Sequence, residues 1–208
     1  VSCNVDINTT GTITMSGVIS FSTNTLKYVT ATSLVTTGST LQLTSFTTIL
    51  DFPASLNNIS IGNASATFLT NITLLGSLTI TSIGGSFTGN TLYIGGGLTY
   101  SGTSSFAGTT NFVFNGTGTW THTSSGTLQN NVTINTAGII TFGTFINYNT
   151  GTFVYTAGTV TTTGNTLAST VSTTFNASGM AFNNVTFSNP TITLTSDLNL
   201  NGTLTITN

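Results

Sequence analysis

The chain has 208 residues, yet charged side chains make up 2% of it, as one lysine and three aspartates, with a single histidine besides. An ordinary soluble domain carries roughly a quarter charged residues, and most chemistry at neutral pH needs carboxylate, imidazole, thiolate or ammonium groups. The composition therefore argues against an enzyme, a metal centre or a bound cofactor. A single lysine also excludes the phosphate neutralisation on which nucleic-acid binding depends.

Hydroxyl and amide side chains take the place of charge on the predicted surface. The formal net charge is −2, so little repulsion keeps copies of the chain apart, and we expect it to associate with itself. No apolar run approaches the roughly 18 residues that a membrane-spanning helix needs. The hydroxyl-rich surface, with Lys27 as the single trypsin site, favours a location outside the cell or on its surface.

The chain is internally repetitive. Residues 131–141 match residues 4–14, a second copy starts at 57–61, and a further copy starts at 183–187. Such an ordered series of matches predicts one repeat array rather than separate domains. The predicted units cover about residues 1–56, 57–129, 130–182 and 183–208, the last of them truncated.

Within a unit the hydrophobic pattern has a period of two. Residues 78–81, 192–195 and 203–207 each place Leu or Ile on one face and Thr on the other. This alternation predicts half-buried β-strands, and the Gly, Asn and Ser residues that interrupt the runs every 8–12 residues or so predict turns. We therefore expect an all-β protein.

Many short strands in units of 50 to 70 residues are compatible with two architectures. The preferred one is a parallel β-solenoid, or β-helix, in which each unit makes about two or three coils stacked roughly 4.8 Å apart. Units that differ by about twenty residues favour it, because one extra coil absorbs the difference. The alternative is a string of tandem antiparallel β-sandwich repeats.

The pattern of residues 183–187 and 192–207 resembles the β-strand repeats of very large secreted bacterial surface proteins, which are common among adhesin-like proteins of the Bacteroidota type. The resemblance covers most of the chain, through motifs of low complexity. It implies an extracellular, adhesive or filamentous role, and it transfers no catalytic residue.

The carboxylates are Asp6 and Asp51 near the two ends of the first unit and Asp197 in the last unit, so they are far apart in the sequence. Glycan-cleaving enzymes typically need a carboxyl pair about 5–10 Å apart. Nothing in the sequence pairs these aspartates, so we interpret them as turn-forming or solvent-facing. Alternation places Trp120 and His122 on one face of a strand. That pair is either an ordinary aromatic pair in a sheet or a small platform for stacking a sugar, and with no second histidine it is not a metal site.

Two further residue types are candidate sites. Cys3 is either an inter-subunit thiol that forms a disulfide or anchor, or a small residue near the terminus. Asn58, Asn131 and Asn184 lie in sequons and share one column of the repeat. A turn or ladder role explains them, and glycosylation remains an alternative that depends on the host.

The leading functional hypothesis is a structural protein that forms an extracellular fibre or surface filament by end-to-end β-stacking of its own copies. A solenoid end exposes unpaired strand edges unless it is capped. The predicted assembly edges are Val5, Ile7, Ile13, Leu198, Leu200, Leu204 and Ile206. The alternative is an adhesin-type module that recognises a glycan, a cell surface or ice through an exposed Thr, Asn or aromatic stripe.

Overall fold

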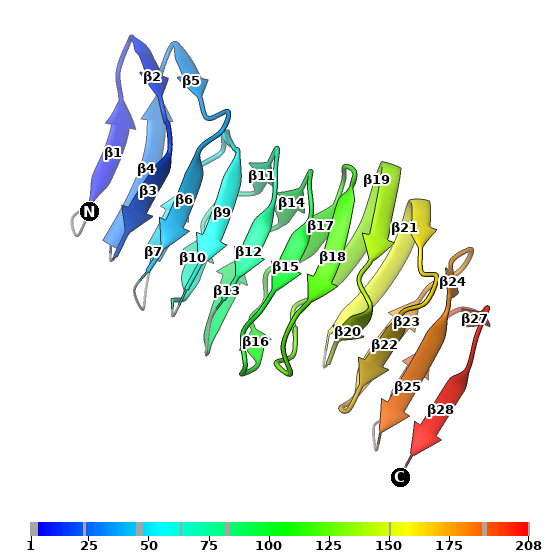
Figure 1. Ribbon diagram of the computed structural model, residues 1–208. Helices are drawn as coiled ribbons and strands as arrows, with labels where there is room; N and C mark the ends of the chain where they lie inside the picture. The colour runs from blue at the N-terminus through cyan, green and yellow to red at the C-terminus, as the bar shows by residue number, and fades with distance from the viewer. Residues whose placement is uncertain are drawn as a thin grey trace.

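The computed structural model of the chain describes residues 4–22, 24–44, 48–62, 64–81, 84–149, 151–188 and 191–207. This part of the chain is all-β, without helices, and winds into a parallel β-solenoid of about 10 turns (Figure 1). The predicted solenoid is confirmed. The alternative of antiparallel sandwiches is wrong, because the described strands pair in parallel from one turn to the next.

The strands form rows that run along the solenoid axis. The front row of Figure 1 contains β3 (Val18–Phe21), β6 (Thr40–Leu43), β9 (Asn58–Ile61), β12 (Leu78–Ile80), β15 (Leu98–Tyr100), β18 (Gly118–His122), β20 (Phe145–Asn147), β22 (Thr166–Ser169), β25 (Asn184–Ser188) and β28 (Leu204–Thr207). A second row contains β8 (Ser55–Leu56), β11 (Ile72–Leu74), β14 (Leu92–Ile94), β17 (Phe112–Phe114), β19 (Val132–Phe142), β21 (Thr152–Thr161), β23 (Thr173–Asn176) and β26 (Ile192–Leu194). The long strands β19 and β21 belong to both rows, because residues 140–142 of β19 pair with β18 and residues 139–141 pair with 159–161 of β21.

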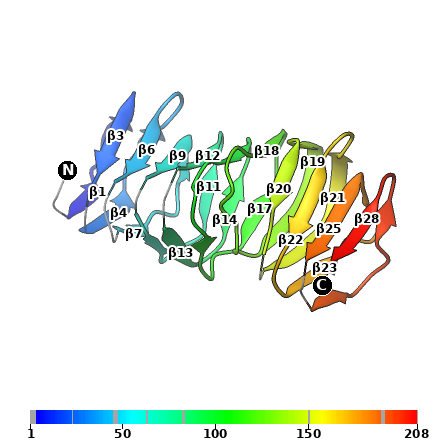
Figure 2. The ribbon, with the colours of Figure 1, turned by 60° about the horizontal axis from the view of Figure 1, so that its bottom comes forward.

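A third row contains β1 (Val5–Asn8), β4 (Asn24–Thr30), β7 (Thr48–Asp51), β10 (Ala66–Phe68), β13 (Gly85–Gly89) and β16 (Phe106–Ala107). Two short pairs complete the strands of the described residues: β2 (Thr12–Thr14) with β5 (Ser33–Val35), and β24 (Ala181–Phe182) with β27 (Asn199–Leu200). Figure 2 shows the rows running side by side along the axis, and the buried apolar side chains of the described residues form one cluster.

One coil of the solenoid takes about twenty residues. In the second row, Ile72 is in register with Leu92, Leu92 with Phe112, Phe112 with Val132, and Val132 with Phe153. The coil is therefore the structural repeat that the register defines, whereas the longer units read from the sequence stay a prediction.

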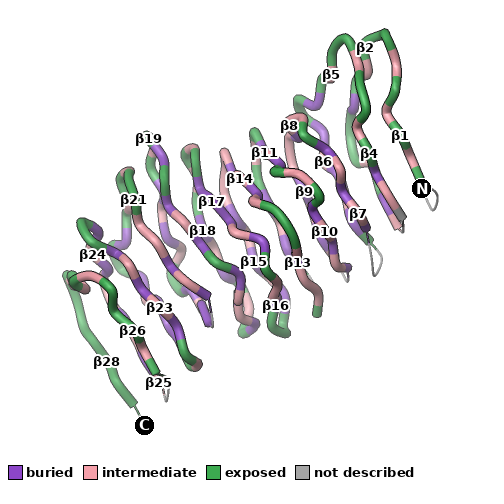
Figure 3. Tube along the Cα trace, turned by 180° about the vertical axis from the view of Figure 1, so that it is seen from behind, coloured by how far each residue is buried: buried purple, intermediate pink, exposed green. Residues whose placement is uncertain are grey.

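The period-two pattern of the sequence explains how each coil fills the core. In β11, β14 and β19 the side chains of Leu74, Ile94 and Ile134 point inward and are fully buried. The residue before each of them, which is Thr73, Tyr93 or Thr133, is half-buried on the outward face. Figure 3 shows the buried positions following the inside of the solenoid, and exposed positions covering its first and last coils. The core is one continuous stack of apolar side chains.

Hydroxyl side chains also link one coil to the next. The Oγ1 atoms of Thr44, Thr81 and Thr195, each just beyond a strand, donate to backbone carbonyls of the preceding coil at 3.1 Å. Threonine thus supplies both a β-branched side chain that suits a strand and a donor that ties its coil to the neighbouring one.

Close approach of two coils requires glycine at Gly108. Its φ is +138°, and a Cβ at this position would overlap the backbone of Phe87 on the preceding coil. We predict that Gly108→Ala lowers the free energy of unfolding by at least about 2 kcal/mol, because the backbone must shift and adopt a strained φ. Gly84→Ala is the control, since a Cβ there meets nothing within 4 Å; equal stability of the two variants in urea-induced unfolding would contradict the close packing.

Candidate functional site

The last coil presents its core-facing side chains to solvent. Leu204 and Ile206 of β28 are 44% and 67% exposed, whereas Val185 and Phe187, their register partners on the preceding coil, are buried. Leu194 of β26 is likewise exposed. Within the described residues no further coil packs on this surface, so apolar side chains that are internal elsewhere remain open here.

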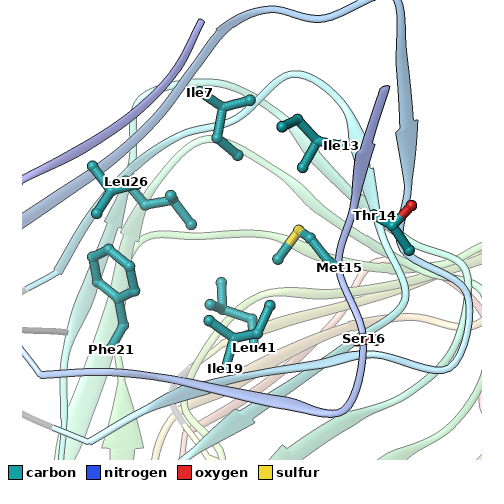
Figure 4. A pocket seen from close by; sticks show the side chains of 10 residues that line it. Ile7, Ile13, Thr14, Met15, Ser16, Ile19, Phe21, Leu26 and Leu41 are labelled. Carbon is teal, nitrogen blue, oxygen red and sulfur yellow. The ribbon is translucent and has the colours of Figure 1, made fainter. Parts of the chain in front are cut away.

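The first coil, at the opposite end of the described solenoid, leaves a cavity between its apolar side chains. A cavity of about 350 Å³ lies at this end, lined by apolar residues that include Val5, Ile7, Ile13, Met15 and Ile19. Figure 4 shows side chains surrounding this space, with Ile7 and Ile13 on one side of it and Ile19 and Leu41 on the opposite side. The end of the described solenoid is therefore an apolar socket rather than a closed cap.

The residues that the sequence analysis named as assembly edges lie on these two surfaces. Val5, Ile7 and Ile13 line the socket; Leu204 and Ile206 are exposed on the last coil, and Leu198 and Leu200 are half-buried beside them. Sequence reasoning missed Ile19, Met15 and Leu194. Alternation was the available signal for all three, since Met15 continues the pattern of residues 12–15 on the same face as Ile13.

Three of the four charged residues form one ladder. Asp6, Lys27 and Asp51 occupy register-paired positions on β1, β4 and β7, on the outward face between core residues such as Leu26 and Leu50. Asp6 and Asp51 therefore lie in strands, not in turns, while Asp197 is exposed in the connection after β26. Opposite charges on neighbouring strands attract, so Lys27 favours this register and separates the two carboxylates.

Trp120 and His122 share one face of β18, as alternation predicted, but that face is the core. Trp120 is fully buried, and His122 is 8% exposed. The His122 ring lies 5.0 Å from that of Tyr100 and 6.0 Å from that of Trp120. The pair therefore belongs to the aromatic core and offers no platform on which a sugar in solution can stack.

His122 is held in its neutral form. Its Nδ1 accepts a hydrogen bond from the backbone N–H of Asn147 at 3.3 Å, and its Nε2 has no hydrogen-bond partner among the described residues. Burial away from water lowers the pKa of His122 from 6.5 to about 4, because the protonated ring loses its hydration. The same cause raises the pKa of Tyr100 to about 12.

The asparagines of the sequons act as rungs between coils. Asn58 Oδ1 accepts from the Ser77 N–H at 2.8 Å. Asn131 and Asn184 make the equivalent bond, at 2.9 Å, to a backbone N–H one coil later. These three asparagines therefore link successive coils, as expected of a side-chain ladder, and their glycosylation stays a prediction. In Asn58 the Nδ2 atom, to which a glycan would attach, donates to the Ser39 carbonyl at 3.2 Å. Cys3 lies outside the described residues.

No protein-family model matches the chain, and neither a curated protein nor a solved structure is significantly similar to it. Across the residues that the structure describes, no helix is long and apolar enough to cross a membrane. No group of three or more His, Cys, Asp or Glu side chains is gathered there as a metal site. The candidate functional site is the pair of end surfaces, on the evidence of the exposed apolar side chains of the last coil and the apolar cavity of the first.

Burial of His122 makes the stability of the protein depend on pH. Below pH 6.5 the unfolded chain binds a proton that the folded chain does not accept until about pH 4. We predict that the free energy of unfolding is fully retained above pH 6.5 and falls by about 2 kcal/mol between pH 7 and pH 5. Urea-induced unfolding at the two pH values measures the loss.

His122→Phe is the matched variant, since it keeps a ring against Tyr100 and Trp120 but cannot titrate. It loses the Asn147 hydrogen bond and is expected to be about 1 kcal/mol less stable at pH 7, with little change between pH 7 and pH 5. The same pH dependence in the variant and in the parent chain would show that His122 is not its source.

Proposed function

We propose that this chain is a non-enzymatic structural protein of an extracellular or cell-surface filament. Its copies would stack head to tail, so that the coil–coil packing inside one copy continues into the next. A surface that joins to a different surface of the next copy generates an open filament rather than a closed dimer. The composition supports this role, because nearly all side chains are apolar, hydroxyl or amide groups.

The observation that carries the proposal is that, among the described residues, core positions of the last coil are exposed while those of the first coil surround an apolar cavity. Ile206 is 67% exposed, although Phe187, the same position one coil earlier, is buried. Burying one Leu or Ile side chain is worth about 1.5–3 kcal/mol. Contact between the last coil of one copy and the socket of another would remove several such side chains from water at once.

The strand rows suggest the register of the junction. β3 and β28 are the first and last strands of the front row (Figure 1), and among the described strands each pairs along one edge only, β3 with β6 and β28 with β25. Their core-facing residues alternate in the same way, with Ile19 and Phe21 on β3, and Leu204 and Ile206 on β28. In the proposed junction β28 pairs in parallel with β3 of the next copy, and Ile206 lies beside Phe21.

A charge at Ile206 tests the junction. We predict that the parent chain sediments as polymers, whereas Ile206→Lys sediments as a monomer of 21.4 kDa, because the junction would have to bury an unpaired ammonium group. Ile139→Lys is the matched control. Ile139 is 49% exposed on β19, on the side of the solenoid rather than at an end, so this variant is expected to polymerise.

Sedimentation velocity over a range of concentrations gives the result, and circular dichroism checks that each variant keeps its β-structure. A parent chain that stays monomeric throughout would refute the proposal. So would equal polymerisation of Ile206→Lys and the parent chain.

A second candidate is the adhesin-type binding module, which one observation favours. On the outward face of the front row, Ser60, Thr79, Thr99 and Thr121 are in register on four successive coils. Such a regular, uncharged array of hydroxyls suits a neutral glycan or an ice surface. Binding on a glycan array, or inhibition of ice recrystallisation, by Ile206→Lys would favour this function over the passive filament.

A further inference from the structure

Two asparagines, Asn115 and Asn201, each stand directly before a glycine and then a threonine. In an Asn-Gly pair the glycine backbone nitrogen can attack the carbonyl carbon of the asparagine side chain, because glycine has no Cβ to hinder the approach. Both asparagines are exposed, and within the described residues neither side chain forms a hydrogen bond. The two sites therefore share the same local chemistry, and the packing around each decides how readily it reacts.

Coils on both sides hold the first of these pairs, Asn115 and Gly116. The Asn115 N–H donates to the Ile94 carbonyl of the preceding coil at 3.1 Å. The Gly116 carbonyl accepts from the Thr136 hydroxyl of the following coil at 2.8 Å, and a Cβ at Gly116 would overlap the backbone of Gly95. The attack requires the backbone to rotate until the nitrogen approaches the side-chain carbonyl, and contacts on both sides oppose that rotation.

The second pair, Asn201 and Gly202, lies in the last coil and is held from one side. The Asn201 N–H donates to the Phe182 carbonyl at 2.8 Å, and the Thr203 N–H donates to Asn184 Oδ1 at 2.9 Å. Both acceptors belong to the preceding coil, and no described strand pairs with the other edge of β27 or β28. A segment with contacts on one side opens more readily than an interior one, so the attacking nitrogen meets less resistance here.

We propose that Asn201 is a site of spontaneous modification that the filament junction protects, and the protection rests on the proposed function. The Gly202 nitrogen loses its proton and bonds to Asn201 Cγ, while the side-chain amide leaves as ammonia, which produces a cyclic succinimide. Water then adds to either ring carbonyl and opens the ring to aspartate or isoaspartate. The net reaction consumes one water and releases one ammonia, so it needs neither an enzyme nor an oxidant.

The product places a negative charge on the coil that forms the junction. Asn201 directly follows Leu200 and shares its coil with Leu204 and Ile206, so the next copy would have to pack against an unpaired carboxylate. Isoaspartate also lengthens the backbone before β28 and disturbs its register. In a filament, by contrast, the next copy holds this coil from its second side, as the interior coils are held. Unstacked chains therefore lose their ability to join, and stacked chains keep theirs.

The first test is mass spectrometry of proteolytic peptides from the Ile206→Lys chain, incubated at several pH values above 7. We expect Asn201 to convert at least about tenfold faster than Asn115, at a rate that rises with pH because the attacking nitrogen must lose its proton. In urea the two rates should converge, since the fold no longer separates them. Asn201→Gln is the matched variant, because its longer side chain disfavours ring closure, and it should leave conversion at Asn115 unchanged. Equal rates at the two asparagines of the folded chain, or no conversion at Asn201, would overturn the proposal.

The second test compares the polymeric parent chain with the Ile206→Lys monomer. Conversion of Asn201 should be at least about tenfold slower in the polymer. Asn201→Asp should reduce polymerisation in sedimentation velocity, whereas Asn115→Asp, which adds the same charge to an interior coil, should polymerise like the parent chain. Equal conversion in polymer and monomer, or equal polymerisation of the two aspartate variants, would overturn the protection. A monomeric parent chain would refute the filament itself, and the ratio of the two rates in Ile206→Lys would still decide the modification.

Discussion

Hydrogen bonding between successive coils is the constraint on which the rest of the structure depends. A short strand cannot satisfy its own backbone N–H and carbonyl groups, and an unpaired buried group costs free energy comparable to a lost hydrogen bond. In this chain each coil meets that requirement through the coils on either side, as the unbroken register from Ile72 to Phe153 illustrates. The arrangement has no internal stopping point, and among the described residues the first and last coils each have a neighbouring coil on one side only.

The same constraint explains why the sequence has so little charge. In a solenoid, each outward position recurs on the next coil about 4.8 Å away, and like charges opposite each other on neighbouring strands are destabilising. Threonine, serine and asparagine can be stacked without that cost and also bond across coils, as Thr81 and Asn58 do. Where charges do occur in adjacent coils their signs alternate, with Lys27 between Asp6 and Asp51.

The sequence predicted those features that arise from local patterns. Alternation at 78–81 and 203–207 identified strands and their buried faces, and the matching asparagines at Asn58 and Asn184 mark strand starts with the same rung to the next coil. A glycine stands beside each of these rungs, since a Cβ at Gly76 or Gly202 would meet the asparagine Oδ1. Those repeated motifs therefore have a direct structural cause.

Features that depend on register between coils were not predictable. Nothing local in Asp6, Lys27 and Asp51 indicates that they are neighbours, because about twenty residues separate each from the next. Alternation put Trp120 and His122 on one face but could not tell that this face is the core, which depends on how β15, β18 and β19 enclose it. The second coil, which contains β5, is wider than the third, and this difference is known only once the register of Leu26 with Leu50 and of Leu41 with Ile59 is fixed.

The account rests on the claim that coil stacking continues from one copy of the chain into the next, and fibre diffraction from aligned parent material tests it most directly. If stacking is continuous, the solenoid axis lies along the fibre axis and the strands lie perpendicular to it. The spacing between strands of neighbouring coils then gives a strong reflection near 4.8 Å along the fibre axis. A 4.8 Å reflection perpendicular to the fibre axis, or material that forms no fibres, would contradict end-to-end stacking.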